Sequence, residues 1–139
     1  MNDKYFFDTN ILVYANDSSE KEKQNIARDL IKDSLHKQNG VISVQVLSEF
    51  WVTVTRKIKT PLSIEIAEKE IELFQLMEIV DLDYQLFKEA IRFQRLIHIS
   101  YWDSLILAAS HSSGCKKIYT EDLNHGQIIS NMELCNPFL

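Results

Sequence analysis

The most constraining feature of this chain is a regular alternation of short apolar segments with longer amphipathic ones. Within the longer segments, apolar residues recur every three or four positions, which predicts helices over Thr9–Ala15, Ser19–Lys37, Val44–Ile58, Ser63–Met77, Tyr84–Ile97 and from Ser100 towards Gly114. The short runs between them predict strands at Lys4–Phe7, Val41–Ser43, Glu78–Val80 and Lys117–Tyr119. Because a parallel crossover needs the length that a helix supplies, we expect an α/β fold with a central, mainly parallel sheet and helices on both faces.

The helical spacing also predicts inward-facing side chains and helix ends. Gly40 and Gly114 are expected to end the second and last helices, and Pro61 to close the third. The core-facing residues should be Leu47, Phe50, Trp51, Val54 and Ile58 in the third helix, Ile64, Ala67, Ile71 and Phe74 in the fourth, and Phe87, Ile91 and Phe93 in the fifth.

Length and composition favour one domain over residues 1–139. With 45% apolar residues, the chain can bury a sizeable core without disulfide bonds. Cys115 and Cys135 form neither a CxxC motif nor a Cys/His pattern, so a structural zinc site is not indicated and a reducing cytoplasm suits them. We expect neither a leader peptide nor a membrane span, and hence a cytoplasmic protein.

The net charge argues against extended nucleic-acid binding. At −5 it lacks the surplus of Lys and Arg on which phosphate-backbone affinity usually rests. If four of the acids are gathered at one metal site, however, the rest of the chain is close to neutral and bound divalent ions offset the local field.

Two acids follow predicted strands and should lie at the same edge of the sheet. Asp8 comes directly after the first strand, and Asp122 follows the strand that ends at Tyr119. In parallel sheets, ligands bind beyond the carboxyl ends of the strands, where both acids are expected. Each also has an ordinary explanation, as a helix N-cap for Asp8 and as a turn residue for Asp122.

Two further acids interrupt apolar helices. Asp103 lies three residues after Ser100, as in a capping box, and precedes an almost wholly apolar helix. Glu49 interrupts the apolar run from Val44 to Val52, and no Lys or Arg lies three or four residues away to pair with it. Four acids at element ends or core margins are compatible with one pocket, and carboxylates held together require a cation.

The donor type predicts the metal and the reaction. Oxygen ligands without histidine spacing favour Mg²⁺, or Mn²⁺, over Zn²⁺. Such an ion lowers the pKa of a bound water and stabilises the leaving oxygen of a phosphodiester. The predicted site therefore comprises Asp8, Glu49, Asp103 and Asp122 and predicts a hydrolase.

Four sequence motifs, taken in order, resemble those of PIN-domain nucleases, and particularly the VapC-type toxins of toxin–antitoxin pairs. They are the strand followed by Asp8-Thr9-Asn10-Ile11-Leu12, the Ser48-Glu49-Phe50 segment, the Trp102-Asp103-Ser104-Leu105-Ile106 helix start, and the strand followed by Thr120-Glu121-Asp122. The resemblance spans nearly the whole chain. It implies a PIN-like three-layer α/β/α sandwich, Mg²⁺- or Mn²⁺-dependent cleavage of RNA, frequent homodimers, and inhibition by a small antitoxin protein that covers the active-site groove.

Carried over by position, the resemblance makes Asp8, Glu49, Asp103 and Asp122 the metal-binding acids. Asn10 and Thr120 match polar residues that support the acids through hydrogen bonds, and Glu121 is a further supporting candidate. The segment that follows Asp122 departs from the commoner basic or aromatic continuation, which leaves the roles of His125 and Gln127 open.

Other functions on a similar fold remain alternatives. A phosphatase with a phospho-aspartate intermediate also places Asp after the first strand, but it needs a second acid where this chain has Asn10. A receiver-like signalling module would use Asp81 or Asp83 after the third strand as its phosphoacceptor. Such a module needs an acid pair at Asp8 and a lysine at the position of Thr120, and this chain has neither. Asp83 is better explained as a helix cap. A non-catalytic PIN domain used for binding would not need all four acids.

Overall fold

The strands form one sheet, and the helices connect them in the order that the sequence predicts. The computed structural model describes residues 3–139. The elements in chain order are β1 (Lys4–Phe7), α1 (Thr9–Tyr14), α2 (Lys21–Lys37), β2 (Gly40–Ser43), α3 (Val44–Val52), the π-helical turn η1 (Thr53–Lys57), α4 (Ile64–Phe74), β3 (Glu78–Val80), α5 (Tyr84–Ile97), α6 (Tyr101–Ser112), β4 (Cys115–Tyr119), β5 (Ile128–Ile129) and β6 (Met132–Cys135).

The sheet has the strand order β3-β2-β1-β4-β6-β5, and every pair is parallel except β5 with β6. The chain leaves β1 towards β2 on one side and returns to β4 on the other, so the strand order reverses between β1 and β4. The register pairs Phe7 with Tyr119, which brings the carboxyl ends of these two strands level. Ligands bind at such a reversal in open α/β sheets.

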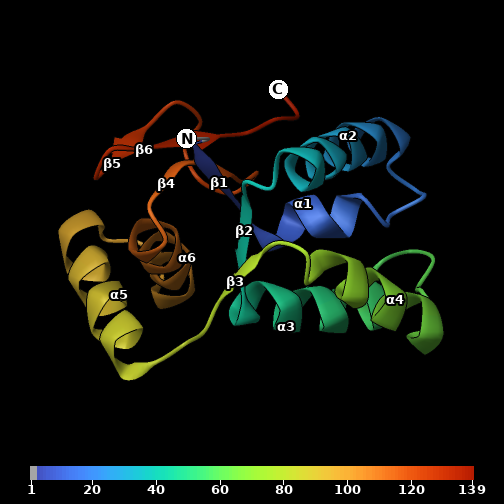
Figure 1. Ribbon diagram of the computed structural model, residues 1–139, viewed down its shortest axis with the longest axis horizontal. Coiled ribbons are helices and arrows are strands. Elements are labelled where there is room, and N and C mark those ends of the chain that lie inside the picture. Colours follow the sequence, from blue (N-terminus) through green and yellow to red (C-terminus); the bar gives the residue numbers. More distant parts are fainter. Residues whose placement is uncertain (1–2) are drawn as a thin grey trace.

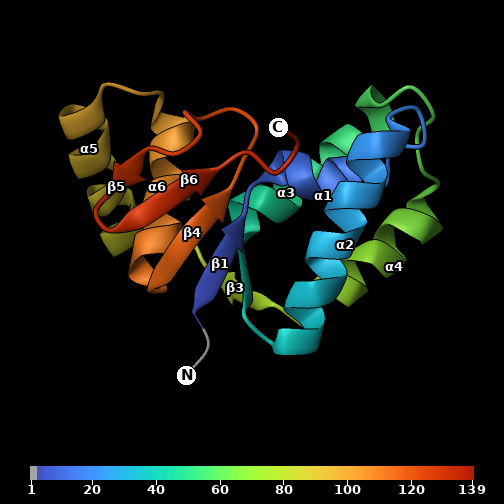
Figure 2. The same ribbon diagram turned by 90° about the horizontal axis from the view of Figure 1, so that it is seen from above.

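Helices cover both faces of the sheet, which confirms the predicted mixed α/β architecture. Figures 1 and 2 show α5 and α6 together on one side and α1 to α4 gathered on the other. The core between these layers includes Phe6 and Phe7 of β1, Val41 and Ile42 of β2, and Leu107 of α6, all of them almost completely buried. Among the described residues, no helix is long and apolar enough to cross a membrane.

The predicted inward face of α5 is wrong in two of its three residues. Phe93 is buried as predicted, but Phe87 and Ile91 are exposed, and the helix buries Leu86 and Ala90 beside Phe93. Both stripes have helical spacing, but only the stripe that contains Ala90 presents a small side chain to the closely packed α6. Ile64, at the start of α4, is likewise exposed, whereas Ala67 and Phe74 are buried as predicted.

Two predictions about helix ends differ from the structure. The second helix ends at Lys37 as predicted, but Gln38, and not Gly40, takes the left-handed conformation, with φ 56°. Gly40 lies in β2, where a Cβ atom would stand 3.0 Å from Ser34 Oγ. The third predicted helix changes to a π-helical turn at Thr53, and Ile58 is already extended. Gly114 follows the last helix with φ +76°, as predicted.

The sequence prediction missed the hairpin β5–β6 entirely. Ser130 and Asn131 join its strands with positive φ at both positions, the backbone of a type I′ turn. The turn lacks the glycine that usually marks this geometry, although asparagine tolerates it. Met132 and Leu134 are buried and Glu133 is exposed, an alternation that could have identified β6.

Candidate active site

Asp8 lies at the carboxyl end of β1, in the point where the strand order reverses. Its backbone N–H donates to Tyr119 O of β4 at 3.0 Å, so the position is fixed by the sheet. The side chain is buried and accepts hydrogen bonds from Thr120 Oγ1 at 2.8 Å and from the Thr9 backbone N–H at 2.7 Å. The bond from Thr9 shows that Asp8 also caps α1. The capping role and a role at the site therefore coexist in one side chain.

Burial raises the pKa of Asp8 from its ordinary value of 3.8 to about 7. The hydrogen bonds from Thr120 and Thr9 oppose the rise, and the neighbouring carboxylates of Asp122 and Glu49 add to it. The Asp8 carboxylate therefore lies within electrostatic range of the carboxylates of Asp122 and Glu49. A bound cation would favour the ionised form of Asp8 and offset its repulsion by these two acids.

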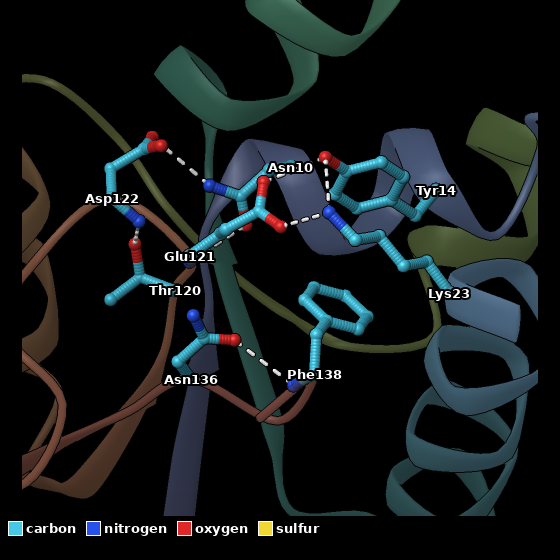
Figure 3. A network of polar contacts seen from close by, with 8 residues as sticks. All are labelled: Asn10, Tyr14, Lys23, Thr120, Glu121, Asp122, Asn136 and Phe138. Atoms are coloured by element: carbon cyan, nitrogen blue, oxygen red, sulfur yellow. Dashed lines mark hydrogen bonds and ion pairs between the residues drawn. The ribbon is translucent and has the colours of Figure 1, made fainter. Parts of the chain in front are cut away.

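Asp122 is held in place by polar contacts with Asn10 and Thr120 (Figure 3). Asn10 Nδ2 donates to Asp122 Oδ2 at 3.0 Å, and the Asp122 backbone N–H donates to Thr120 Oγ1 at 3.2 Å. Thr120 thus accepts from the backbone of one acid while it donates to the side chain of the other. The structure places Asn10 and Thr120 where the sequence predicts supporting residues.

Glu49 reaches the same region from α3. Ser43 at the end of β2 caps this helix through its hydroxyl, which accepts from the Val46 N–H at 3.3 Å. One carboxylate oxygen of Glu49 accepts from Thr9 Oγ1 at 2.6 Å, and the other accepts from Gln45 Nε2 at 3.4 Å. Thr9 therefore links Glu49 to Asp8, since its N–H and its hydroxyl contact different acids.

Asp103 lies in the first turn of α6, half-buried. Its backbone N–H donates to Ser100 Oγ at 3.1 Å, as the capping-box pattern predicts. The connection to the other acids runs through Gln45, whose Nε2 also donates to the Trp102 carbonyl at 3.2 Å. The structure brings Asp8, Glu49 and Asp122 together and places Asp103 at the edge of this group.

A groove of about 780 Å³ opens beside the acids. Thr9, Asn10, Glu49 and Asp122 line one part of it, and Lys57 and Lys59 line another. The π-helical turn η1 supplies Thr53 and Lys57 to this lining. Such turns are frequent at functional sites.

The side chain of Glu121 points towards Tyr14 and Lys23. Its carboxylate accepts a hydrogen bond from Tyr14 Oη at 2.6 Å and forms an ion pair with Lys23 Nζ of α2 (Figure 3). Desolvation works against its charged form, but the contacts with Lys23 and Tyr14 outweigh it and lower the pKa of Glu121. The structure thus separates Glu121 from Asp122, although they are adjacent in sequence.

The donor set fits a divalent cation in its chemistry. All the converging groups are oxygens, and within residues 3–139 no ion pair involves Asp8, Glu49, Asp103 or Asp122. In that same part of the chain, no three His, Cys, Asp or Glu side chains are already arranged around one ion position. Hydrogen bonds from Thr9, Gln45 and Asn10 reach oxygens of Glu49 and Asp122, but each carboxylate oxygen keeps a second lone pair with which to coordinate an ion.

Comparison with known families agrees with this geometry. A model of the PIN domain matches residues 5–128. The chain belongs to the PIN domain family. The match includes all four acids and ends at the start of β5, so it covers the whole candidate site. No curated protein matches the chain at a significant level.

Solved structures share the fold of this PIN domain at low sequence identity. VapC20 of Mycobacterium tuberculosis, a sarcin–ricin loop cleaving toxin, has 18% identity and a TM-score of 0.67 over 86% of this chain and 90% of its own. A toxin–antitoxin complex from Klebsiella pneumoniae has 16% identity and a TM-score of 0.69 over 96% of this chain and 98% of its own. VapBC2 from Rickettsia felis, bound to a DNA fragment from its promoter, has 22% identity and a TM-score of 0.62 over 94% and 96% of the two chains.

Sequence reasoning missed several residues that shape the site of this PIN domain. Thr9 and Gln45 contact the acids directly, and Tyr14 and Lys23 hold Glu121. Thr9 could have been found because it lies between Asp8 and Asn10. Nothing in the spacing of Lys23 along α2 indicates its partner, which lies 98 residues away.

His125 and Gln127, whose roles the sequence leaves open, both make structural contacts. His125 Nδ1 accepts from the Asn136 backbone N–H at 2.9 Å, and the Gln127 carbonyl accepts from the Leu134 N–H at 2.9 Å. Both residues therefore attach the loop after Asp122 to β6 and the segment behind it.

Proposed function

We propose that this PIN domain is a divalent-metal-dependent endoribonuclease whose site comprises Asp8, Glu49, Asp103 and Asp122. The observation that carries the proposal is the convergence of Asp8, Glu49 and Asp122, without a basic partner among residues 3–139, where the strand order reverses. Repelling carboxylates beside an open groove favour a site that binds cations over a purely structural one. The similarity to a toxin that cleaves RNA supports the same reading.

Each acid has a distinct expected task. Asp8 is buried and held by two hydrogen bonds, so it would be the fixed ligand of Mg²⁺ or Mn²⁺. Glu49 and Asp122 line the groove and would complete the ligand set together with Asp103. The bound ion would supply an activated water and stabilise the charge on the leaving oxygen. Thr120 and Asn10 orient the acids.

Lys57 and Lys59 give this acidic protein a local surface for RNA. They line the groove that contains Glu49 and Asp122, and no ion pair or hydrogen bond within the described chain engages either ammonium group. Two free cations in the groove can contact the phosphates that flank the cleaved one. This local positive charge supports RNA binding by a chain whose net charge is −5.

We assign the domain a biological role as the toxin of a toxin–antitoxin pair, acting in the cytoplasm and restrained by a small antitoxin protein. Its similarity to structures of toxin–antitoxin complexes supports this role. Expression of the chain alone should then arrest bacterial growth, and co-expression of a short neighbouring gene should restore it. Normal growth on expression of an active nuclease would exclude the toxin role and leave the nuclease role intact.

The predicted homodimer has a candidate surface on α5. The apolar side chains of Tyr84, Phe87, Ile91 and Leu96 are exposed there. A second copy of the chain would remove this apolar area from water. The face lies on the opposite side of the sheet from α1 and α2 (Figure 1).

The decisive experiment compares cleavage of a single-stranded RNA by the wild type and by Asp8→Asn. Cleavage should require Mn²⁺ or Mg²⁺, stop on addition of EDTA, and be absent in Asp8→Asn. Asp33→Asn is the matched control, because Asp33 is an exposed carboxylate on α2 that pairs with Lys37. Activity of Asp8→Asn close to that of the wild type would overturn the site. Hydrolysis of a phosphomonoester in place of RNA would favour the phosphatase alternative.

A further inference from the structure

The contacts of Glu121 extend from α2 to the candidate metal site. Lys23 Nζ pairs with one carboxylate oxygen of Glu121, and Tyr14 Oη donates to the other. The two charged side chains are only about one-third and one-quarter exposed, at 34% and 26%. This ion pair is therefore better shielded from solvent than those on the open surface.

Aromatic rings enclose the ammonium group of Lys23. Nζ lies 4.7 Å from the centroid of the Tyr14 ring and 5.6 Å from that of Phe138, and the two rings meet edge to face at 5.0 Å. Figure 3 shows Phe138 below the ion pair, held by the bond from its N–H to Asn136 Oδ1 at 2.9 Å. Contacts from α1, α2 and the C-terminal segment thus fix Lys23 and, through it, Glu121.

The backbone N–H of Glu121 is linked to the side chain of Asp122 through the amide group of Asn10. The Glu121 N–H donates to Asn10 Oδ1 at 3.3 Å, and the same amide group of Asn10 donates to Asp122 Oδ2 at 3.0 Å. The orientation of the Asn10 amide is thereby set by Glu121 at one end and by Asp122 at the other. A shift of residue 121 would move the Asn10 amide and break its hydrogen bond to the Asp122 carboxylate.

We propose that Lys23 and Glu121 are positioning residues that hold Asp122, through Asn10, in its orientation towards the candidate metal site. Lys23 has a second effect, because it holds the Glu121 carboxylate in an ion pair. Without Lys23, Glu121 becomes a competing negative group next to Asp122. The inference rests on the proposed nuclease function, and it adds α2 to the elements that determine metal binding.

The test measures Mn²⁺ binding by electron paramagnetic resonance and Mn²⁺-dependent cleavage of a single-stranded RNA for Lys23→Met and Lys23→Arg. Lys23→Met should weaken Mn²⁺ binding about tenfold, the low end for residues that act behind metal ligands, with KM for RNA unchanged. Lys23→Arg keeps the charge and should restore binding to near the wild-type value. Lys4→Met removes another ion pair, with Glu78, and is the control for loss of a lysine charge.

A nuclear magnetic resonance spectrum gives a readout independent of catalysis. The Asn10 side-chain NH₂ signals should move in Lys23→Met and in Glu121→Ala, and should stay in place in Lys4→Met. Equal Mn²⁺ affinity in wild type and Lys23→Met, or an unmoved Asn10 signal, overturns the inference. If the wild type itself binds no Mn²⁺ and cleaves no RNA, it is the proposed function that fails, which separates the two results.

Discussion

Replacement of Asp8 by Asn should stabilise the metal-free protein above neutral pH while it abolishes cleavage. The pKa of Asp8 is raised in the folded protein, chiefly by burial, from 3.8 to about 7. Between these two values the native state holds a proton that the unfolded chain has released. Stability is therefore lost as the pH rises from about 4 through about 7, and the loss is complete above the folded-state pKa.

The magnitude follows from the same shift. A pKa of about 7 in place of 3.8 corresponds to roughly 4 kcal/mol of destabilisation above pH 7. Asn cannot ionise, and its amide can accept from the Thr9 N–H and donate to Thr120 Oγ1 in place of the present contacts. Allowing about 1 kcal/mol for poorer hydrogen-bond geometry, Asp8→Asn should be more stable than the wild type by about 3 kcal/mol at pH 8.

Urea unfolding in EDTA at pH 4 and at pH 8 measures this difference. At pH 4 the two proteins should be nearly equal or the wild type slightly more stable, and at pH 8 the variant should be the more stable. Saturating Mg²⁺ should stabilise only the wild type, since the ion binds the ionised acid. A stability difference that does not change with pH would refute the assignment of Asp8 as the buried, strained carboxylate.

Three further predictions concern the groove, the supporting hydroxyl and the α5 face. In the double variant Lys57→Ala, Lys59→Ala, the slope of log affinity for RNA against log salt concentration should become less steep by about 1.4, the value for two lost phosphate contacts. An unchanged slope would exclude both residues from the RNA site. Thr120→Val should cost about 2 kcal/mol in urea unfolding because two hydrogen bonds, one buried and one partly buried, lose their partner, whereas Thr120→Ser should cost less than half as much. Light scattering should give a dimer for the wild type and a monomer for Leu96→Asp, and a monomeric wild type would exclude the dimer.

The part of the site that follows strands could be predicted from the sequence. Asp8 and Asp122 come directly after apolar runs, and parallel strands place their carboxyl ends at one edge of a sheet. That rule needs only the order of elements. The same rule does not place Glu49 near these two acids, because its position depends on the direction in which α3 leaves β2.

The direction of individual side chains could not be predicted from the sequence. Glu121 and Asp122 are adjacent and chemically alike, yet one contacts Lys23 and the other Asn10. What separates them is the position of α2, a tertiary contact that local spacing does not encode. The wrong prediction for Phe87 and Ile91 in α5 has the same origin, because Ala90, and not these two residues, packs against α6.

The packing of Phe138 on Tyr14 and Lys23 has a practical consequence for work with this protein. The C-terminal segment ends beside α1, whose Tyr14 contacts Phe138 and lines the groove, whereas β1 begins at the opposite end of the sheet (Figure 2). An affinity tag or fluorescent fusion joined after Leu139 would pull on Phe138 and crowd the mouth of the groove. A fusion at the amino-terminal end would leave both free, so activity that depends on which end carries the tag should be interpreted with this arrangement in mind.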